Sequence, residues 1–167
     1  MASEYLLNNA ALHHPLWSFS LALYARPGVA AHLLARQEEY HVWINDWLLS
    51  TWLAQQNQTL CSDFKSRIAS WQEWREANVL VWRAMRQGLD KQQSPDAYRK
   101  ASAIELKLEQ LDQAYLYQHH RRLAERSALN PKRCLQLSLQ KLSECPERAL
   151  LSTSELLLSE ARELPLS

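Results

Sequence analysis

The segment Glu38–His41 reads Glu-Glu-Tyr-His, and the Glu-x-x-His pattern within it is a possible metal-binding motif. Two such motifs, together with two further helical glutamates, hold the paired metal ions of ferritin-like helical bundles. Neither His119 nor His120 follows a glutamate at this spacing, so the chain has one motif only. Glu105 and Glu109 flank the apolar seam of their predicted helix rather than lie in it. We therefore expect no metal ion and interpret the motif as a solvated helix end.

Asp46 is a candidate buried acid, because it lies in the almost wholly apolar segment 42–55. A lone carboxylate is costly to bury unless a cation accompanies it. We expect a partner on the preceding helix, where Arg36 and His32 are the candidates. Asp46 is then either a functional acid or half of a structural ion pair near a helix N-terminus, where negative charge is stabilised. We favour the structural ion pair.

The chain has seven tryptophans, which raises the possibility of an aromatic cage for a cation or a stacking platform for bases. Most tryptophans between residues 43 and 82 lie on apolar helical stripes, so we expect them to pack in the core. Trp82 is the exception, since it lies off the main stripe and shares a flank with Arg75, Arg83 and Arg86.

The segment 118–133 is basic, with two adjacent histidines and the single acid Glu125. Its five cations are Arg121, Arg122, Arg126, Lys132 and Arg133. A solvated helix C-terminus is one interpretation, because cations are stabilised there. The other is a surface for an anionic partner, either RNA or an acidic protein face. The net charge of +1 argues against binding through bulk positive charge.

Signatures of catalysis and of cofactor binding are absent from the sequence. Two glycines cannot supply G-x-G-x-x-G, and they lie too far apart for a phosphate-binding loop. Cys61, Cys134 and Cys145 form no C-x-x-C pair and are expected to be free thiols in a reducing compartment. No signal peptide and no membrane-spanning stretch is evident. We predict a cytoplasmic location, no catalytic residue, no metal and no cofactor.

Helices must position these side chains, because glycine is nearly absent. Two glycines in 167 residues are far below the usual level of about 7%, while Leu, Ala, Gln, Glu and Arg, which favour helices, are abundant. We predict a single all-α domain over residues 1–167, an irregular bundle of about six to eight helices. Residues 1–13 and 164–167 are expected to fray.

Prolines mark several helix starts. Pro15 suits the first position of a helix, and Pro27 with Gly28 predicts a tight corner between two helices. Ser70–Glu73 matches a capping box and predicts a helix start, with an inward stripe in the following residues. The stripe consists of Trp71, Trp74, Asn78, Val81 and Met85. Further helices are expected over residues 42–55, 61–70, 131–142 and 153–163, with a linker at 57–59.

The longest predicted helix begins at Pro95. Apolar residues from Ala97 to Tyr115 alternate steps of four and three, which is typical of a heptad seam. We expect this helix to pack lengthwise within the bundle, and its region 95–127 is a possible homodimer contact.

The segment Leu16–Gln37, LWSFSLALYARPGVAAHLLARQ, resembles the start of an uncharacterised proteobacterial family of conserved hypothetical proteins. The family pattern is L/F-W-x-F-S-L-x-x-Y-x-x-P-G-V, followed by a Gln and an Asn. The matching residues are Trp17, Phe19, Ser20, Leu21, Tyr24, Pro27, Gly28, Val29, Gln37 and Asn45. Weaker similarity covers Trp71–Arg86 and Tyr98–Glu109, whereas His41 and Trp43 depart from the pattern. The resemblance implies a cytosolic all-α protein and implies no known activity.

We expect a non-enzymatic interaction or regulatory module, an adaptor for a macromolecular partner that is most simply another protein. The expected binding surface is Trp82, Arg83, Arg86, His119, His120, Arg121, Arg122 and Arg126. One alternative is an RNA- or ribosome-associated factor that binds through residues 118–133. The other is an enzyme or small-ligand carrier with a Trp-lined pocket near Asp46.

Overall fold

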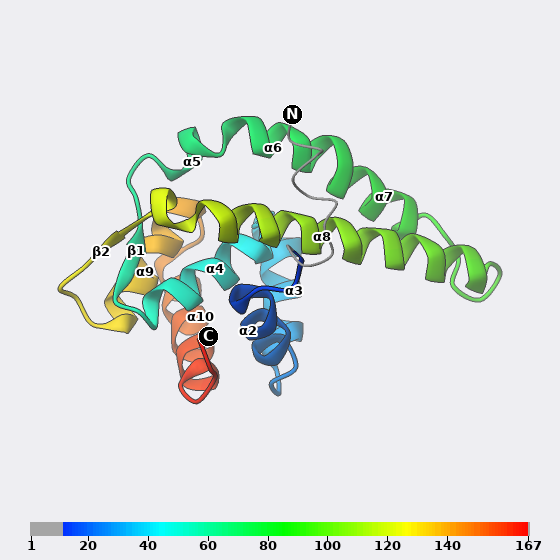
Figure 1. Cartoon of the computed structure of the whole chain (residues 1–167). Coiled ribbons are helices and arrows are strands. Elements are labelled where there is room, and N and C mark those ends of the chain that lie inside the picture. Colours follow the sequence, from blue (N-terminus) through cyan, green and yellow to red (C-terminus); the bar gives the residue numbers. More distant parts are fainter. Residues whose placement is uncertain (1–11, 167) are drawn as a thin grey trace.

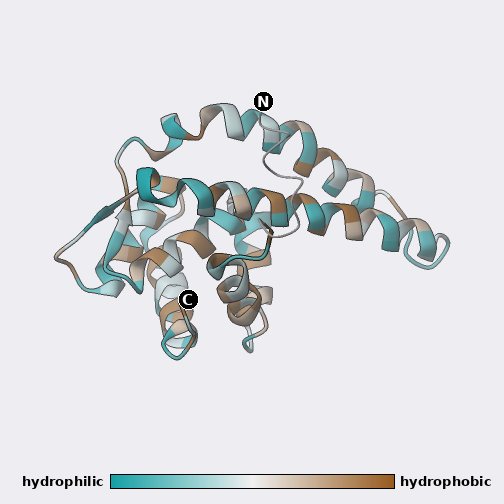
Figure 2. Ribbon diagram, in the orientation of Figure 1, coloured by the Kyte–Doolittle hydropathy of each residue, from teal (hydrophilic) through white to brown (hydrophobic). Residues whose placement is uncertain are grey.

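The computed structural model describes residues 12–166, and the predicted all-α class is confirmed. The helices pack around one hydrophobic core, and a long helical hairpin projects from this body (Figure 1). Hydrophobic residues concentrate on α2 (Pro15–Tyr24) and α4 (Ile44–Ala54), while hydrophilic residues recur along α8 (Pro95–Leu123) (Figure 2). Within the described part, none of the helices combines the length and apolar character needed to span a bilayer.

The first two helices meet at the predicted corner. Helix α2 (Pro15–Tyr24) begins with its proline at the first position, and α3 (Val29–Tyr40) follows Gly28. Gly28 has a φ of +79°, in the left-handed region that favours glycine. A Cβ there would meet no atom within 4 Å, so backbone conformation rather than space requires the glycine.

Helix α4 (Ile44–Ala54) is the centre of the body, and every residue from Asp46 to Ala54 is buried. It contacts α2, α3, the long helix α8 (Pro95–Leu123) and helix α9 (Pro131–Leu142). Its position agrees with the prediction of a helix over residues 42–55.

A continuous helical rod packs against α8 and forms the projecting hairpin (Figure 1). It consists of α6 (Ala69–Arg75), the π-helix η1 (Glu76–Leu80) and α7 (Val81–Gln87). The rod begins without a side-chain cap, so the predicted capping box is wrong. The predicted inward stripe also fails beyond η1, because Val81 and Met85 are 48% and 53% exposed.

A small antiparallel sheet joins β1 (Gln58–Leu60) to β2 (Ala124–Arg126). This corrects the expected linker at 57–59, and the expected helix over 61–70 shrinks to α5 (Phe64–Arg67). Asn57 adopts a φ of +53° and turns the chain after α4. A hydrogen bond connects the sheet to α9, because the backbone N–H of Leu60 donates to Ser138 Oγ at 3.0 Å.

Helix α9 begins with Pro131 at its first position, as predicted, whereas α10 (Glu147–Ala161) begins directly after Pro146 and before the expected residue 153. Asn130 caps α9 by accepting a hydrogen bond from the backbone N–H of Arg133. Leu164 and Leu166 contact the core, which differs from the expected frayed end. The frayed end expected at residues 1–13 falls mostly outside the described residues.

Candidate binding cleft

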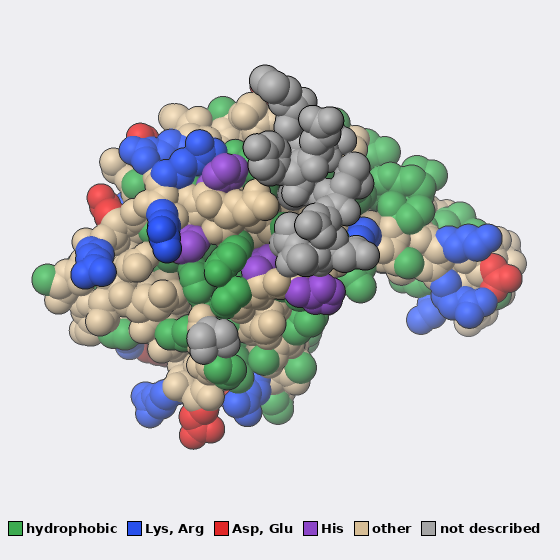
Figure 3. Space-filling model, in the orientation of Figure 1, with side chains coloured by type: hydrophobic (Ala, Val, Ile, Leu, Met, Phe, Trp, Pro, Cys, Tyr) green, Lys and Arg blue, Asp and Glu red, His purple; other side chains and the backbone are tan. Residues whose placement is uncertain are grey.

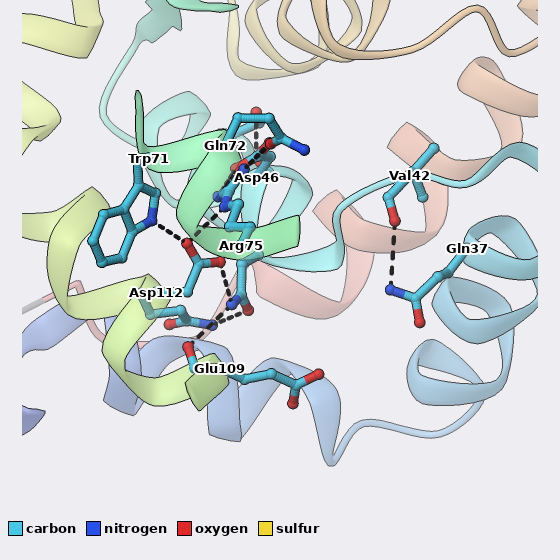
Figure 4. Close-up of polar contacts among 11 residues, drawn as sticks. Gln37, Val42, Asp46, Trp71, Gln72, Arg75, Glu109 and Asp112 are labelled. Atoms are coloured by element: carbon cyan, nitrogen blue, oxygen red, sulfur yellow. Dashed lines mark hydrogen bonds and ion pairs between the residues drawn. The ribbon is translucent and has the colours of Figure 1, made fainter. Parts of the chain in front are cut away.

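Arg75 joins three helices at a buried polar centre (Figure 4). Its guanidinium is fully buried and donates two hydrogen bonds to Asp46 of α4, at 2.5 and 3.0 Å. Its Nε donates to Asp112 Oδ1 of α8 at 2.7 Å. Asp46 is therefore a buried member of a structural ion pair, as the favoured interpretation held.

The partner of Asp46 is Arg75, so the expectation of Arg36 or His32 is wrong. The helix that carries these two residues, α3, packs partly against α10, and His32 Nε2 lies 2.7 Å from Thr153 Oγ1 of that helix. Arg36 pairs with Glu39 one turn along its own helix, at 2.8 Å. Arg75 lies four residues after the buried Trp71 and therefore on the same face of the helix. This spacing was the sequence signal that Arg75 is buried.

Burial and charge act in opposite directions on this centre. Burial raises the pKa of Asp46, and the attraction of Arg75 opposes that rise. Burial lowers the pKa of Arg75, but the charges of Asp112 and Asp46 outweigh burial and raise it. One guanidinium faces two carboxylates, so these groups need further hydrogen-bond donors.

Neutral donors complete the coordination of Asp112. Trp71 Nε1 donates to Oδ1 at 2.7 Å, and Asn45 Nδ2 donates to Oδ2 at 2.8 Å. Because an ionised carboxylate only accepts, this contact fixes the orientation of the Asn45 amide. Gln113 Nε2 then donates to Asn45 Oδ1 at 2.9 Å, which leaves Gln113 Oε1 without a partner among the described residues.

A cleft of about 980 Å³ lies beside this centre, between α2 and α3 on one side and η1, α7 and α8 on the other. Asn45, Asp112 and Gln113 of the buried centre contribute to its lining. Four leucines line its walls and are between 42% and 53% exposed. They are Leu21, Leu34, Leu80 and Leu106.

The predicted Trp-lined pocket near Asp46 corresponds only in part to this cleft. Trp17 and Trp43 line it, but Asp46 does not, because Arg75 covers its carboxylate. Glu38 and His41 also line the cleft. Among residues 12–166, no group of three His, Cys, Asp or Glu side chains could hold a metal ion.

Ion pairs engage both arginines of the cleft. Arg83 donates to Glu105 and to Glu109, each at 2.9 Å, and Arg86 also pairs with Glu105. Burial raises the pKa of Glu109, and Arg83 opposes the rise. Burial also raises the pKa of Tyr24, a rise to which the charge of Glu109 adds. Among residues 12–166, both arginines in the lining of the cleft are therefore paired.

The expected partner surface divides into two. Arg83 and Arg86 lie opposite the first half of α8, whereas the segment 118–126 is at the far end of that helix. His119 follows Glu105 by fourteen residues, which corresponds to about 21 Å at the helical rise. Trp82 is half-buried on α7 and does not line the cleft.

The basic end of α8 has its own arrangement. Arg121, Arg122 and Arg126 are exposed, and no ion pair engages them within the described part of the chain. Figure 3 shows Lys and Arg side chains over this end of the molecule, with histidines beside them.

Aromatic stacking accompanies the two histidines of this end. The ring centroids of Tyr115 and Trp71 are 4.0 Å apart in a stacked pair, and the ring of His119 lies edge-on to that of Tyr115. His120 contacts the rings of Tyr117 and Trp52 instead. The two histidines thus contact different aromatic groups.

No curated protein and no solved structure matches the chain. A family model does match, over residues 15–116. This span contains every residue that lines the cleft and all three members of the ion-paired centre, but not the basic segment 118–133. The matched span exceeds half of the chain, and the protein belongs to the family described as Protein of unknown function (DUF2390).

Proposed function

We propose that this protein is a non-enzymatic cytosolic interaction module that binds an amphipathic helix of a partner protein in the cleft. The observation that carries this proposal is the half-exposed leucines, contributed by different helices, in the lining of a cleft that also contains polar residues. Leu21 and Leu34 belong to one wall, and Leu80 and Leu106 to the other. Helix-in-groove recognition uses this kind of surface, with apolar anchors of the ligand placed between two walls.

The floor of the cleft is rigid enough to act as a preformed receptor. Asn45 and Gln113 are hydrogen-bonded to each other, and Asn45 is bonded to the buried Asp112. Arg75 fixes Asp112 in turn, and it ties α6 and α8 to α4. A preorganised surface loses less conformational entropy on binding, which favours affinity.

The position of the leucines favours a helix over a small molecule. A site for a small ligand encloses most of the ligand surface, and apolar groups within such a site are largely shielded from water. Here the leucines remain about half exposed, so an occupant must cover the walls as well as fill the cleft. A helix with side chains is about 10 to 12 Å wide and can contact both walls at once.

Substitution of Leu106 tests this proposal. Leu106→Glu places a charge on the wall of the cleft at a side chain that is 53% exposed, so the fold should persist. We expect a partner protein captured by the wild-type chain to bind Leu106→Glu at least tenfold more weakly. Leu151→Glu is the matched control, because Leu151 is 39% exposed on α10 and does not line the cleft. Equal loss with both variants, or with neither, would contradict the proposal.

A second candidate function is binding of an anionic partner, such as RNA, at the basic end of α8. The supporting observation is the exposure of Arg121, Arg122 and Arg126. RNA binding through these arginines would weaken steeply with salt, and their joint replacement by alanine would reduce the salt dependence. A flat salt response would count against it.

A further inference from the structure

Negative charge predominates in the lining of the cleft. Five carboxylates and only two arginines belong to this lining. The carboxylates are Glu38, Glu76, Glu105, Glu109 and Asp112. Arg83 and Arg86 are shared between Glu105 and Glu109, and Arg75 behind the wall is shared between Asp112 and Asp46.

Several carboxylates keep acceptor capacity toward the cleft. Glu38 and Glu76 are exposed and take part in no ion pair among residues 12–166. Glu109 accepts from Arg83 through one oxygen, and its side chain is 34% exposed. A cation that enters the cleft can therefore reach carboxylate oxygens that the protein does not satisfy.

Buried side chains in the lining of the cleft also include an unsatisfied acceptor. Gln113 is 1% exposed and lines the cleft, and its Oε1 has no hydrogen-bond partner in the described part of the chain. The hydrogen bonds through Asn45 to Asp112 fix which amide atom is left over, and that atom can only accept. Ser20, which is 3% exposed, lines the same cleft and also has an unpartnered Oγ. A ligand that satisfies Gln113 must bring a donor.

Aromatic rings also belong to the lining of the cleft. Trp17, Tyr24 and Trp43 line the cleft together with Glu109 and Gln113. Glu109 and Gln113 are one helical turn apart and therefore lie on the same face of α8. Aromatic faces attract ammonium and guanidinium groups, and they pack against the aliphatic stems of lysine and arginine.

We propose that the helix bound in this cleft is basic, and that one of its lysine or arginine side chains enters the cleft beside Glu109. This inference rests on the proposed function and specifies the chemistry of the partner. The apolar face of the helix contacts the four leucines, and its basic flanks lie beside Glu38 and Glu76. The inserted side chain donates a hydrogen bond to Glu109, which accepts from Arg83 through one oxygen only.

Two amphipathic model peptides of equal length test the inference against the full chain. Both peptides have the same leucine face, and their polar flanks consist of lysine in one and of glutamate in the other. We expect calorimetric titration to give at least tenfold tighter binding of the lysine peptide. Glu109→Gln, which keeps the side-chain volume, should lower the affinity for the lysine peptide several-fold, whereas a merely structural role would not change the preference between the peptides.

A pair of charge-matched variants separates the cleft from general attraction. The first double variant, Glu38→Gln with Glu76→Gln, removes two carboxylates of the cleft lining. The second, Glu144→Gln with Glu163→Gln, removes two exposed carboxylates that do not line the cleft. Only the first pair should weaken binding of the lysine peptide. Equal binding of both peptides, binding of neither, or equal effects of the two variant pairs would overturn the inference. The proposed function would still be tested separately, by the binding of the natural partner protein to Leu106→Glu.

Discussion

At the residue scale, Arg75 connects the fold to the cleft, because its guanidinium orders the carboxylates behind the cleft floor. Removing the cation leaves two buried carboxylates, Asp46 and Asp112, without their partner. We expect Arg75→Met to lower the free energy of unfolding by about 3–5 kcal/mol, the usual cost of an uncompensated buried charge. Urea denaturation measures this change.

Asp46→Asn is the comparison for Arg75→Met. The substitution keeps the shape of the side chain and leaves Arg75 paired with Asp112, so one cation then faces one carboxylate. Burial raises the pKa of Asp46, so its charged form is already disfavoured. We expect a smaller loss than with Arg75→Met, and an equal or larger loss would contradict this account of the centre.

His14 gives the fold a pH dependence with a defined sign. Its Nδ1 caps α2 by accepting from Trp17 N at 3.1 Å, and burial, together with the charge of His13, lowers its pKa to about 4. Burial also lowers the pKa values of His32 and His119. The pKa of a histidine in the unfolded chain is about 6.5. The lowered pKa of His14 in the folded chain therefore stabilises the fold above pH 6.5, and this contribution is lost as pH falls toward 4.

His14→Asn tests the contribution of His14 to this pH dependence. Asparagine is also an effective N-cap but does not titrate, so the capping hydrogen bond can be kept while the proton linkage is removed. Unfolding free energies at pH 7 and pH 5 should differ less in the variant than in the wild type. An unchanged pH dependence would show that His14 does not contribute.

The burial of Asp46 could be predicted from the sequence, but its partner could not. A carboxylate within an apolar helix indicates a paired acid, whichever element supplies the cation. Hydrophobic periodicity considers apolar residues only, so it did not predict that Arg75 is buried, although Arg75 lies on the buried side of its helix. The unsatisfied oxygen of Gln113 depends on contacts between three helices, and no local pattern encodes it.

At the scale of elements, the π-helix η1 explains why the inward stripe was wrong. Each turn of a π-helix contains more residues than an α-helical turn, so the face that meets α8 shifts along the rod. Trp71 and Arg75 of α6 and Val79 of η1 are the buried positions of the rod, and Arg83, at the next position four residues on, is 15% exposed. Glu76 and Leu80 of η1 line the cleft as a result of this shift.

The corner between α2 and α3 gives a prediction with an internal control. Gly28→Ala forces an alanine into the left-handed region at a φ of +79° and should destabilise the fold by about 1–2 kcal/mol. Gly88→Ala should be neutral or slightly stabilising, because Gly88 has a φ of −77° and a Cβ there makes ordinary contacts of 3.5 and 3.6 Å. Thermal unfolding of both variants checks the difference, and equal effects would contradict it.

At the scale of the whole molecule, composition was sufficient to predict the fold class, because a chain with two glycines has few means of making tight turns. The small sheet was missed because strands of three residues are too short to show an alternating pattern. One half of the expected partner surface lies on α7, and the other lies at the C-terminal end of α8 and in β2. Sequence proximity to basic residues gave no information on that separation.

The central claim is that the partner binds between the leucine walls of the cleft, and site-specific photo-crosslinking tests it most directly. A photoreactive side chain at Leu80 or at Leu106 places the probe on the wall formed by η1 and α8, and one at Leu151 is the control. We predict that the two cleft positions crosslink to the same amphipathic, basic helical segment of one partner, and that the control position does not. Crosslinks to unrelated segments from the two cleft positions, or the same crosslinks from Leu151, would contradict the claim.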